Sequence, residues 1–253
     1  MIAISLQSGS NGNCIYVETC GVSLLFDAGI SGVQAEQRLA AYGREIRRVD
    51  AVIISHDHSD HVCHAGVYQR KYGLPIYITP KTLEAASKRH RLGRLDDVRH
   101  FRSDGLIRFG EVSVEAVPTP HDGADGAAFV VSARNKRLGI LADLGHMFDG
   151  LDRVVASLDA VFIESNYDPG MLAGGPYPAY LKERISGPSG HLSNIEAAEL
   201  LADAARLRWA CLVHLSENNN LPGIALSTHR RIVGPELVLH TACRYSPTGV
   251  FSV

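Results

Sequence analysis

The sequence predicts an α/β protein in which two mixed β-sheets pack face to face and are flanked by helices. Short apolar runs of strand length alternate with stretches of helical spacing along the whole chain. A β-rich stretch followed by helices occurs twice, and two sheets covered by helices would bury all their apolar faces. No repeat, low-complexity tract or Pro-, Gly- or Ser-rich linker divides the chain. We therefore expect a single domain over residues 1–253.

The first half contains five strand-like runs and three helical stretches. The expected strands are residues 2–6, 15–18, 23–26, 51–55 and 76–79, and the expected helices are residues 34–42, 62–72 and 82–91. The run that begins A-V-I-I at residue 51 has no polar alternation, which is typical of a buried strand.

The second half begins with two predicted hairpins. Residues 106–109 and 112–117 flank Gly110-Glu111, and residues 127–132 and 138–141 flank residues 134–136. Strands at 160–164, 210–213 and 237–240 then alternate with helices at 151–157, 195–206 and 224–232. Ser193 stands three residues before Glu196, the spacing of a capping box, so the helix at 195–206 is expected to start near Ser193.

The composition is typical of a soluble globular protein, with 45% hydrophobic and 21% charged residues. No apolar run is long enough to span a membrane, and the N-terminus does not resemble a secretory signal, so we expect a cytoplasmic protein without a membrane partner. Five cysteines without a CxxC pair indicate reduced thiols. A net charge of −2 excludes a global attraction to nucleic acid, and the basic stretches 44–48 and 88–94 are interpreted as solvated surface.

The stretch S-H-D-H-S-D-H at residues 55–61 is the strongest functional signal. Because residues two apart on an extended chain point the same way, His56 and His58 can converge on one ion. The turn that follows can direct Asp60 and His61 to a point nearby. Imidazole nitrogen and carboxylate oxygen suit Zn, Mn or Fe, so a metal site is favoured over a loop of surface histidines.

Three further potential ligands follow the apolar runs of predicted strands: His121, Asp143 and His214. Each on its own would more often be a capped turn or a satisfied core group. Together with the first cluster they form a consistent set. They could complete the coordination of two metal ions.

This order of residues resembles the metallo-β-lactamase fold of metal-dependent hydrolases, which implies an αββα sandwich. The resemblance implies two divalent ions (Zn, Mn or Fe), one bound by His56, His58 and His121. The other would take Asp60, His61 and His214, with Asp143 bridging and a hydroxide between the ions as the nucleophile. Asp27, at the end of the strand 23–26, would support the ligand loop by hydrogen bonds.

Other features distinguish branches of this fold. His58 stands where flavodiiron oxidoreductases usually have Glu, which argues against redox use. Asp143 and His214 are only 71 positions apart, which leaves no room for the insertion of β-CASP RNA-processing relatives. His191 in G-H-L-S, followed by H-L-S at residue 214, is similar to a pair in tRNase Z, which implies that His191 is a proton donor or phosphate ligand. Its alternative role is to start a helix.

Four stretches, at residues 8–14, 164–168, 175–178 and 214–219, resemble the YycJ-like (WalJ-like) branch of this fold. That branch is associated with 5′-to-3′ exonuclease activity on DNA with manganese or a similar ion. It often has His where this chain has Tyr167. The resemblance implies catalytic roles for Asp60, Asp143 and His191. The candidate substrate contacts are Ser8, Ser10, Asn11, Asn13, Asn166, Ser216 and Asn218, and Tyr167, Tyr177 and Tyr180 could stack an unpaired base.

These observations lead to three alternative functions that can be tested. The favoured one is a dinuclear metal phosphodiesterase acting as a 5′-to-3′ DNA exonuclease. The second is a small-molecule hydrolase of the same fold, acting on a cyclic phosphodiester, a lactone or a thioester. The third is an inactive metal-binding scaffold, which the intact set of ligands argues against. The sequence leaves the metal, the strand preference and the oligomeric state open.

Overall fold

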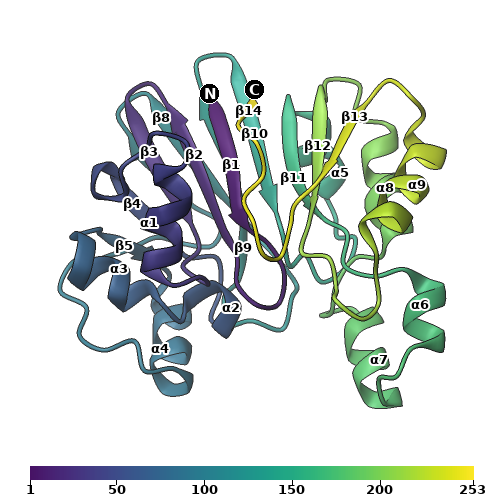
Figure 1. The fold of residues 1–253 in the computed structure, drawn as a ribbon, viewed down its shortest axis with the longest axis horizontal. Coiled ribbons are helices and arrows are strands. Elements are labelled where there is room, and N and C mark those ends of the chain that lie inside the picture. Colours follow the sequence, from purple (N-terminus) through teal and green to yellow (C-terminus); the bar gives the residue numbers. More distant parts are fainter.

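Two seven-stranded sheets form the body of the protein in the computed structural model, which describes residues 1–253. The strand order is β14-β1-β2-β3-β4-β5-β6 in the first sheet and β13-β12-β11-β10-β9-β8-β7 in the second. Each sheet has an antiparallel part and a parallel part. Helices cover the outer face of each sheet (Figure 1). The predicted fold class is confirmed.

The first sheet comes mostly from the N-terminal half. Its strands are β1 (Ile2–Gln7), β2 (Cys14–Thr19), β3 (Val22–Phe26), β4 (Ala51–Ile53), β5 (Ile76–Ile78), β6 (Val98–His100) and β14 (Phe251–Ser252). Its helices are α1 (Gly32–Ala40), the 3-10 turn η1 (Ile46–Arg48), α2 (Ser59–Val62), α3 (Ala65–Tyr72) and α4 (Pro80–Arg89). The chain returns to this sheet only with β14, which pairs antiparallel with β1.

The second sheet comes from the rest of the chain. Its strands are β7 (Leu106–Phe109), β8 (Val112–Pro118), β9 (Ala127–Ala133), β10 (Lys136–Leu141), β11 (Ala160–Glu164), β12 (Trp209–Val213) and β13 (Val238–Thr241). The remaining helices are α5 (Leu151–Ala156), α6 (Pro169–Gly174), α7 (Ala179–Ser186), α8 (Asn194–Ala202) and α9 (Pro222–Val233). None of the helices is long and apolar enough to cross a membrane.

The largest buried cluster lies between the two sheets. It contains residues of both, such as Phe26 of β3 and Phe129 of β9, whose ring centroids are 5.3 Å apart. Two further clusters lie on the outer faces, one beneath α1 and α3 and the other beneath α5 and α8. The cluster between the sheets holds them in one position relative to each other, and that position determines where their strand ends meet.

Several elements differ from the prediction. The expected helix at 62–72 begins earlier, at Ser59, and is interrupted at His64, whose N–H donates to the carbonyl of Ala28. Asp60 and His61 therefore lie on a short helix and not on a turn. The helix expected to end at residue 206 ends at Ala202, although its capping box at Ser193 is confirmed. The helices α6 and α7 were not predicted, because glycines and prolines interrupt their short apolar spacing.

Candidate metal centre

The predicted ligands meet where strands of both sheets end. His56, His58, Asp60 and His61 follow β4 of the first sheet, whereas His121, Asp143 and His214 follow β8, β10 and β12 of the second. Since β10, β11 and β12 are parallel neighbours, their carboxyl ends lie at one edge of the sheet. The structure therefore brings all seven predicted ligands together.

Three residues of this site have left-handed backbone conformations. The φ angles are +67° at Asp27, +53° at Asp143 and +55° at His214. Such a conformation costs roughly 1–2 kcal/mol in a residue with a side chain, so the surroundings must hold it in place. At His214 the N–H donates to Ser8 Oγ (2.8 Å) and the carbonyl accepts from Asn166 Nδ2 (2.9 Å).

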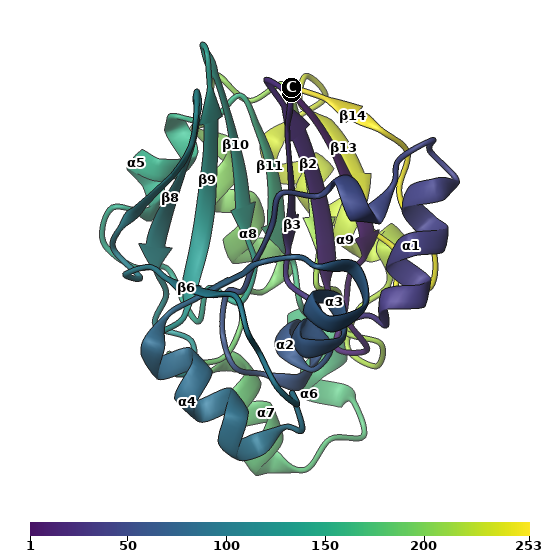
Figure 2. The same cartoon turned by 90° about the vertical axis from the view of Figure 1, so that its left-hand side faces the viewer.

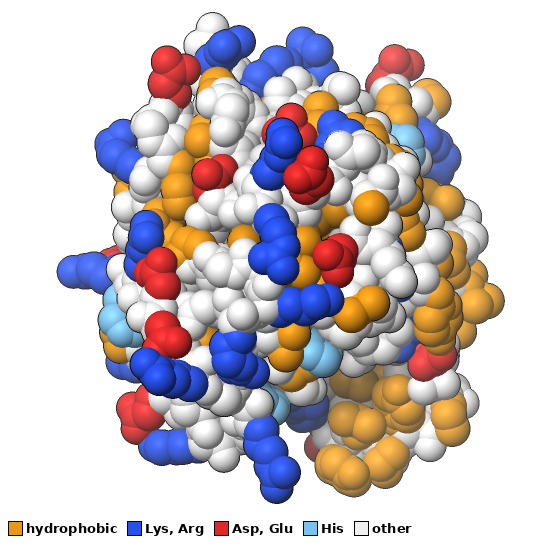
Figure 3. All heavy atoms as spheres, turned by 60° about the vertical axis from the view of Figure 1, so that its left-hand side comes forward, with side chains coloured by type: hydrophobic (Ala, Val, Ile, Leu, Met, Phe, Trp, Pro, Cys, Tyr) orange, Lys and Arg blue, Asp and Glu red, His pale blue; other side chains and the backbone are white.

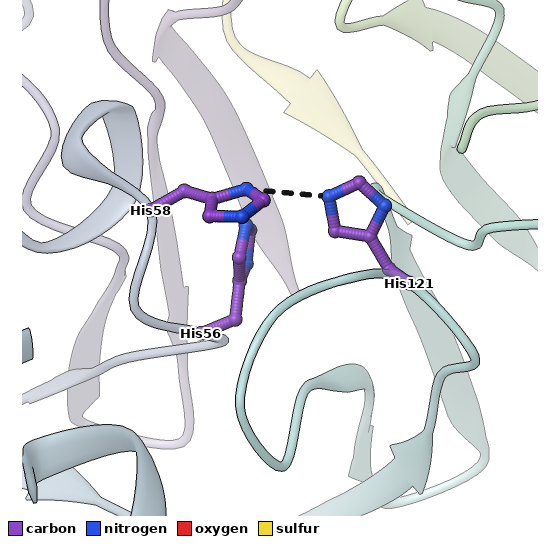
Figure 4. A group of neighbouring side chains, drawn as sticks. All are labelled: His56, His58 and His121. Carbon is purple, nitrogen blue, oxygen red and sulfur yellow. Dashed lines mark hydrogen bonds between the residues drawn. The ribbon is translucent and has the colours of Figure 1, made fainter. Parts of the chain in front are cut away.

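The first group consists of His56, His58 and His121 (Figure 4), whose nitrogens lie within 4.8 Å of one another. His121 Nδ1 donates to the carbonyl of Gly190 (2.7 Å), which leaves Nε2 as an acceptor 3.3 Å from Nδ1 of His58. His56 Nε2 is buried and has no hydrogen-bond partner. Burial lowers the pKa of His56 well below its ordinary value, so its ring is neutral and can offer a lone pair.

The second group consists of Asp60, His61 and His214. Asp60 Oδ2 lies 3.4 Å from His61 Nε2 and 3.3 Å from His214 Nε2. On its other side His61 Nδ1 donates to Asp27 Oδ2 at 2.7 Å, and the same carboxylate accepts from the N–H and Oγ of Ser55. Asp27 thus ties together the two ends of the S-H-D-H-S-D-H stretch.

Asp143 lies between the two groups. Its oxygens are 2.8 Å from His61 Nε2 and 3.1 Å from His214 Nδ1, and 3.9 Å from Nε2 of His121 in the first group. Both oxygens are buried, and neither accepts a well-aligned hydrogen bond despite these close nitrogens. A buried carboxylate that lies among several histidine nitrogens without forming a well-aligned hydrogen bond to any of them is suited to bind a metal ion between itself and those nitrogens.

The donor spacing fits metal coordination. Two atoms that each lie 2.0–2.1 Å from a tetrahedral ion are roughly 3.4 Å apart. The separations of 3.3 Å between His58 and His121, and of 3.3 and 3.4 Å from Asp60 to its two histidines, agree with that value. The residues present therefore fit divalent ions with nitrogen and oxygen ligands.

The carboxylates give the second group an electrostatic preference for cations. Burial opposes the protonation of His61, yet Asp27 and Asp143 raise its pKa well above the ordinary value. Burial is likewise outweighed at His214, where Asp143 and Asp60 raise the pKa to about 10. Despite burial, the same contacts hold the pKa of Asp143 well below its usual range. The position is therefore one that stabilises positive charge.

Glu164 is a member of the site that sequence reasoning missed. This fully buried residue ends β11 and accepts from His191 Nδ1 (2.5 Å) and from the backbone N–H groups of Leu144 (3.0 Å) and Leu192 (3.3 Å). Burial works against charge at His191, but Glu164 and Asp143 together raise the pKa of its ring to about 9. Glu164 ends an apolar run, as Asp143 and His214 do in the sequence, so the same signal could have identified it.

The predicted substrate contacts divide into three sets. Ser8 and Asn13 are buried beneath the site, where Ser8 Oγ donates to Asn13 Oδ1 and Asn13 Nδ2 lies 3.0 Å from His61 Nε2. The N–H groups of Ser8, Gly9, Gly12 and Asn13 all donate within the protein. Ser10, Asn166 and Ser216 line the cleft described below, whereas Asn11 and Asn218 donate to the carbonyl of Arg244 and to Tyr177 Oη.

A cleft of about 410 Å³ opens over the candidate ligands. Its floor includes Asp60, Asp143, His191 and His214. One wall is formed by the end of α4, and the other by α7 and the segment before it, with the apolar side chains Tyr177, Leu181 and Ile185. Figure 2 shows α4 and α7 at the same end of the molecule, as does Figure 1. Tyr167 is buried and Tyr180 is 72% exposed.

Comparison with known proteins identifies the family. Residues 8–169 match the metallo-beta-lactamase superfamily, and the chain belongs to this superfamily. It is 36% identical over 227 residues to exodeoxyribonuclease WalJ of Streptococcus pneumoniae, covering 88% of this chain and 84% of that protein. It is also 36% identical over 224 residues to exodeoxyribonuclease YycJ of Bacillus anthracis, covering 87% and 84% of the two chains. The resemblance to the YycJ-like branch is confirmed.

Solved structures agree with this fold. The metallo-beta-lactamase fold protein YhfI from Bacillus subtilis superposes with a TM-score of 0.76 at 17% identity, covering 100% of both chains. The short form of human tRNase Z superposes with a TM-score of 0.68 at 16% identity, covering 100% of this chain and 99% of the other. At these identities the similarity establishes the shared fold.

Proposed function

We propose that the protein is a dinuclear metal-dependent phosphodiesterase that degrades DNA from the 5′ end. The observation that carries the proposal is the convergence of seven histidine and aspartate side chains beneath an open cleft, beside the buried pair of His191 and Glu164. The names of the relatives, at 36% identity over most of the chain, support DNA as the substrate. The polarity follows from the resemblance to the YycJ-like branch.

The metal ligands are assigned by group. His56, His58 and His121 would hold one ion, Asp60, His61 and His214 the other, and Asp143 lies where it can contact both. Two divalent ions bound there would supply a water of lowered pKa and neutralise charge on the phosphate that is cleaved. Nitrogen and oxygen ligands without thiolate suit Zn, Mn or Fe.

His191 supplies the proton for the leaving oxygen. Although burial disfavours the charged ring, Glu164 and Asp143 raise the pKa of His191 to about 9, which favours a protonated ring at neutral pH. Glu164 holds Nδ1 at 2.5 Å, which leaves Nε2–H as the donor for a group in the cleft. A positioned acid of this kind contributes roughly 10²–10⁴-fold to a rate. Glu164 is therefore a positioning residue for His191.

The walls of the cleft bind the nucleotide. Ser10 and Ser216 offer hydroxyl groups to phosphate oxygens, and Asn166 orients His214. Tyr177 is positioned to stack an unpaired base, and its hydroxyl is held by Asn218 at 2.9 Å. A cytoplasmic location and a single domain remain predictions.

The test uses protein stripped of metal by a chelator and reloaded separately with Mn, Zn or Fe. It is incubated with 5′-phosphorylated DNA, single- and double-stranded, labelled at either end. We expect mononucleotides to be released progressively from the 5′ end and this activity to be lost in Asp143→Ala. Asp149→Ala removes the same charge from an exposed position outside the cleft and is the matched control.

Intact DNA with every metal would overturn the proposal. Turnover of a small phosphodiester or a thioester under those conditions would then identify a small-molecule hydrolase. Bound metal without turnover of any of these compounds would identify a metal-binding scaffold.

A further inference from the structure

Two arginines line the cleft from opposite walls, and each is paired with an aspartate next to a candidate metal ligand. Arg89 at the end of α4 pairs with Asp57, which lies between His56 and His58. Arg184 of α7 pairs with Asp122, which follows His121. All three of these histidines belong to the first group of ligands.

The Arg89 pair is anchored in the protein interior. The side chain of Asp57 is fully buried; Oδ2 accepts from Arg89 Nη1 at 2.5 Å and Oδ1 accepts from the N–H of Ala124 at 2.6 Å. His90 Nε2 lies 2.9 Å from the carbonyl of Asp57. These contacts fix the end of α4 to the loop between His56 and His58. They also hold the guanidinium of Arg89 in a defined position at the edge of the cleft.

The Arg184 pair is more accessible. Nε and Nη2 of Arg184 both lie 2.7 Å from Oδ2 of Asp122. The other oxygen of Asp122 lies 3.3 Å from Nε2 of His58 and 3.4 Å from Nε2 of His121. Asp122 therefore holds Arg184 beside the first group of ligands.

Both arginines keep donors for a ligand. Their side chains are 56% and 53% exposed, and a guanidinium has five N–H donors, of which the aspartates use only part. Planar guanidinium groups match the geometry of phosphate oxygens. In Figure 3, Lys and Arg side chains gather over α4 and hydrophobic side chains over α6 and α7, with a hollow between them.

We propose that Arg89 and Arg184 form a clamp for the phosphates on either side of the phosphodiester that is cleaved. This inference rests on the proposed function and defines its substrate as a polynucleotide strand that crosses the cleft from α4 to α7. The phosphate over the ligands is then held by the metal centre, and its neighbours by one arginine each. Contacts to the phosphate backbone set the register of the strand without reading its sequence.

A bracing role for the two arginines predicts something different. If they serve only to hold Asp57 and Asp122, their loss should lower metal retention and leave the affinity for DNA unchanged. If they contact phosphates, their loss should raise KM and make binding less sensitive to salt, while metal content stays the same. Each phosphate contact contributes about 0.7 to the slope of log K against log salt for single strands.

The experiment measures kcat, KM and their salt dependence for metal-loaded protein on a 5′-phosphorylated single strand. The variants are Arg184→Gln and Arg89→Gln, with metal content determined for each. Arg89→Gln alone leaves the buried Asp57 without its cation. The double variant Asp57→Asn with Arg89→Gln avoids this, because an asparagine at this position can still accept a hydrogen bond from the N–H of Ala124. Arg94→Gln is the matched control, because Arg94 is 83% exposed, pairs with Asp96 and lies outside the cleft.

We expect KM to rise about tenfold at each arginine position, kcat to change less than threefold and the salt slope to fall by about 0.7. Arg184→Lys should recover part of the loss, since it keeps the charge but not the planar fork. An unchanged KM, or a loss confined to metal content, in an active wild-type background would overturn the clamp alone. A wild-type protein that leaves DNA intact would overturn the proposed function and the clamp with it.

Discussion

The substitution Asp27→Asn tests how much the hydrogen bond from a candidate metal ligand, His61, to Asp27 contributes to metal binding, and it leaves the ligand itself in place. Asp27 accepts from His61 Nδ1 at 2.7 Å and from the N–H and Oγ of Ser55 at 2.8 and 3.0 Å. Asparagine has the same shape and tolerates the left-handed φ of +67° at this position. It has only one acceptor oxygen, however, and presents an N–H₂ group where the second carboxylate oxygen stood.

The size of the effect follows from these contacts. The bond from His61 to Asp27 is charge-assisted, and bonds of that kind contribute about 1.5–3 kcal/mol. If that amount is lost from the orientation of His61, the affinity for a metal ion at the second group of ligands should fall about 10–100-fold, the range typical of residues that orient a ligand. The remaining oxygen can still accept a hydrogen bond from the N–H of Ser55, so the free energy of unfolding should change much less.

The assay is a competition titration of metal-free protein against a chromophoric chelator, together with urea unfolding. Asp50→Asn is the control: it removes the same charge at the opposite end of β4, where Asp50 accepts from the N–H of Ser23 at 2.8 Å. We expect wild-type affinity in the control. A metal affinity within twofold of wild type in Asp27→Asn would refute the argument that Asp27 orients His61.

Three further predictions concern other parts of the structure. Gly29→Ala should destabilise the protein by about 3 kcal/mol or more in urea unfolding and weaken metal binding, because a Cβ there would lie 1.7 Å from the carbonyl oxygen of Asp60. The control is Gly223→Ala on α9, where a Cβ meets nothing within 4 Å, and it should be neutral or stabilising. Glu164→Gln should leave KM unchanged and lower kcat at pH 8.5 by roughly tenfold or more. His191 loses one of the two carboxylates, Glu164 and Asp143, that raise its pKa to about 9, so it releases its proton at lower pH. An alkaline limb of the pH–rate profile at the wild-type position would contradict this role. Burial lowers the pKa of His229 to about 4, so between pH 6.5 and 4 the unfolded chain binds a proton that the folded one does not. The free energy of unfolding therefore decreases as the pH is lowered through that window. Between pH 7.5 and 4.5 the wild type should therefore lose about 2.5 kcal/mol more than His229→Gln in urea unfolding, and equal losses would show that His229 is protonated in the fold.

The sequence was most informative where a polar residue ends an apolar run. Asp27 and His214 stand directly after a strand and Asp143 one residue further on, and the structure places all three at the same end of the two sheets. A charged or ionisable residue in that position has to be satisfied by other residues at the strand ends, which is why the sequence could predict proximity before any distance was known. The sequence pattern could therefore indicate the seven predicted ligands.

The supporting residues were harder to predict, because their roles depend on long-range contacts. Glu164 has the same sequence signal as Asp143, yet its role becomes visible only through its distance to His191. Asp57 lies inside the stretch that attracted attention first, but its partner Arg89 is 32 residues away and its other partner, Ala124, is 67 residues away. The helices α6 and α7 carry no strong periodicity, so the apolar wall of the cleft was not expected.

Neither the first nor the second group of predicted ligands comes from one sheet alone. In the first group His56 and His58 come from the first sheet and His121 from the second, and in the second group Asp60 and His61 come from the first sheet and His214 from the second. The site therefore forms only when the cluster between the sheets, including Phe26 and Phe129, has fixed their relative position. Because an ion that contacts both sheets binds the docked arrangement and not the separated one, its binding energy adds to the stability of the interface between them. Packing between the sheets and metal binding are in this way two parts of one equilibrium, and a core substitution far from the cleft can weaken the metal centre without altering any ligand.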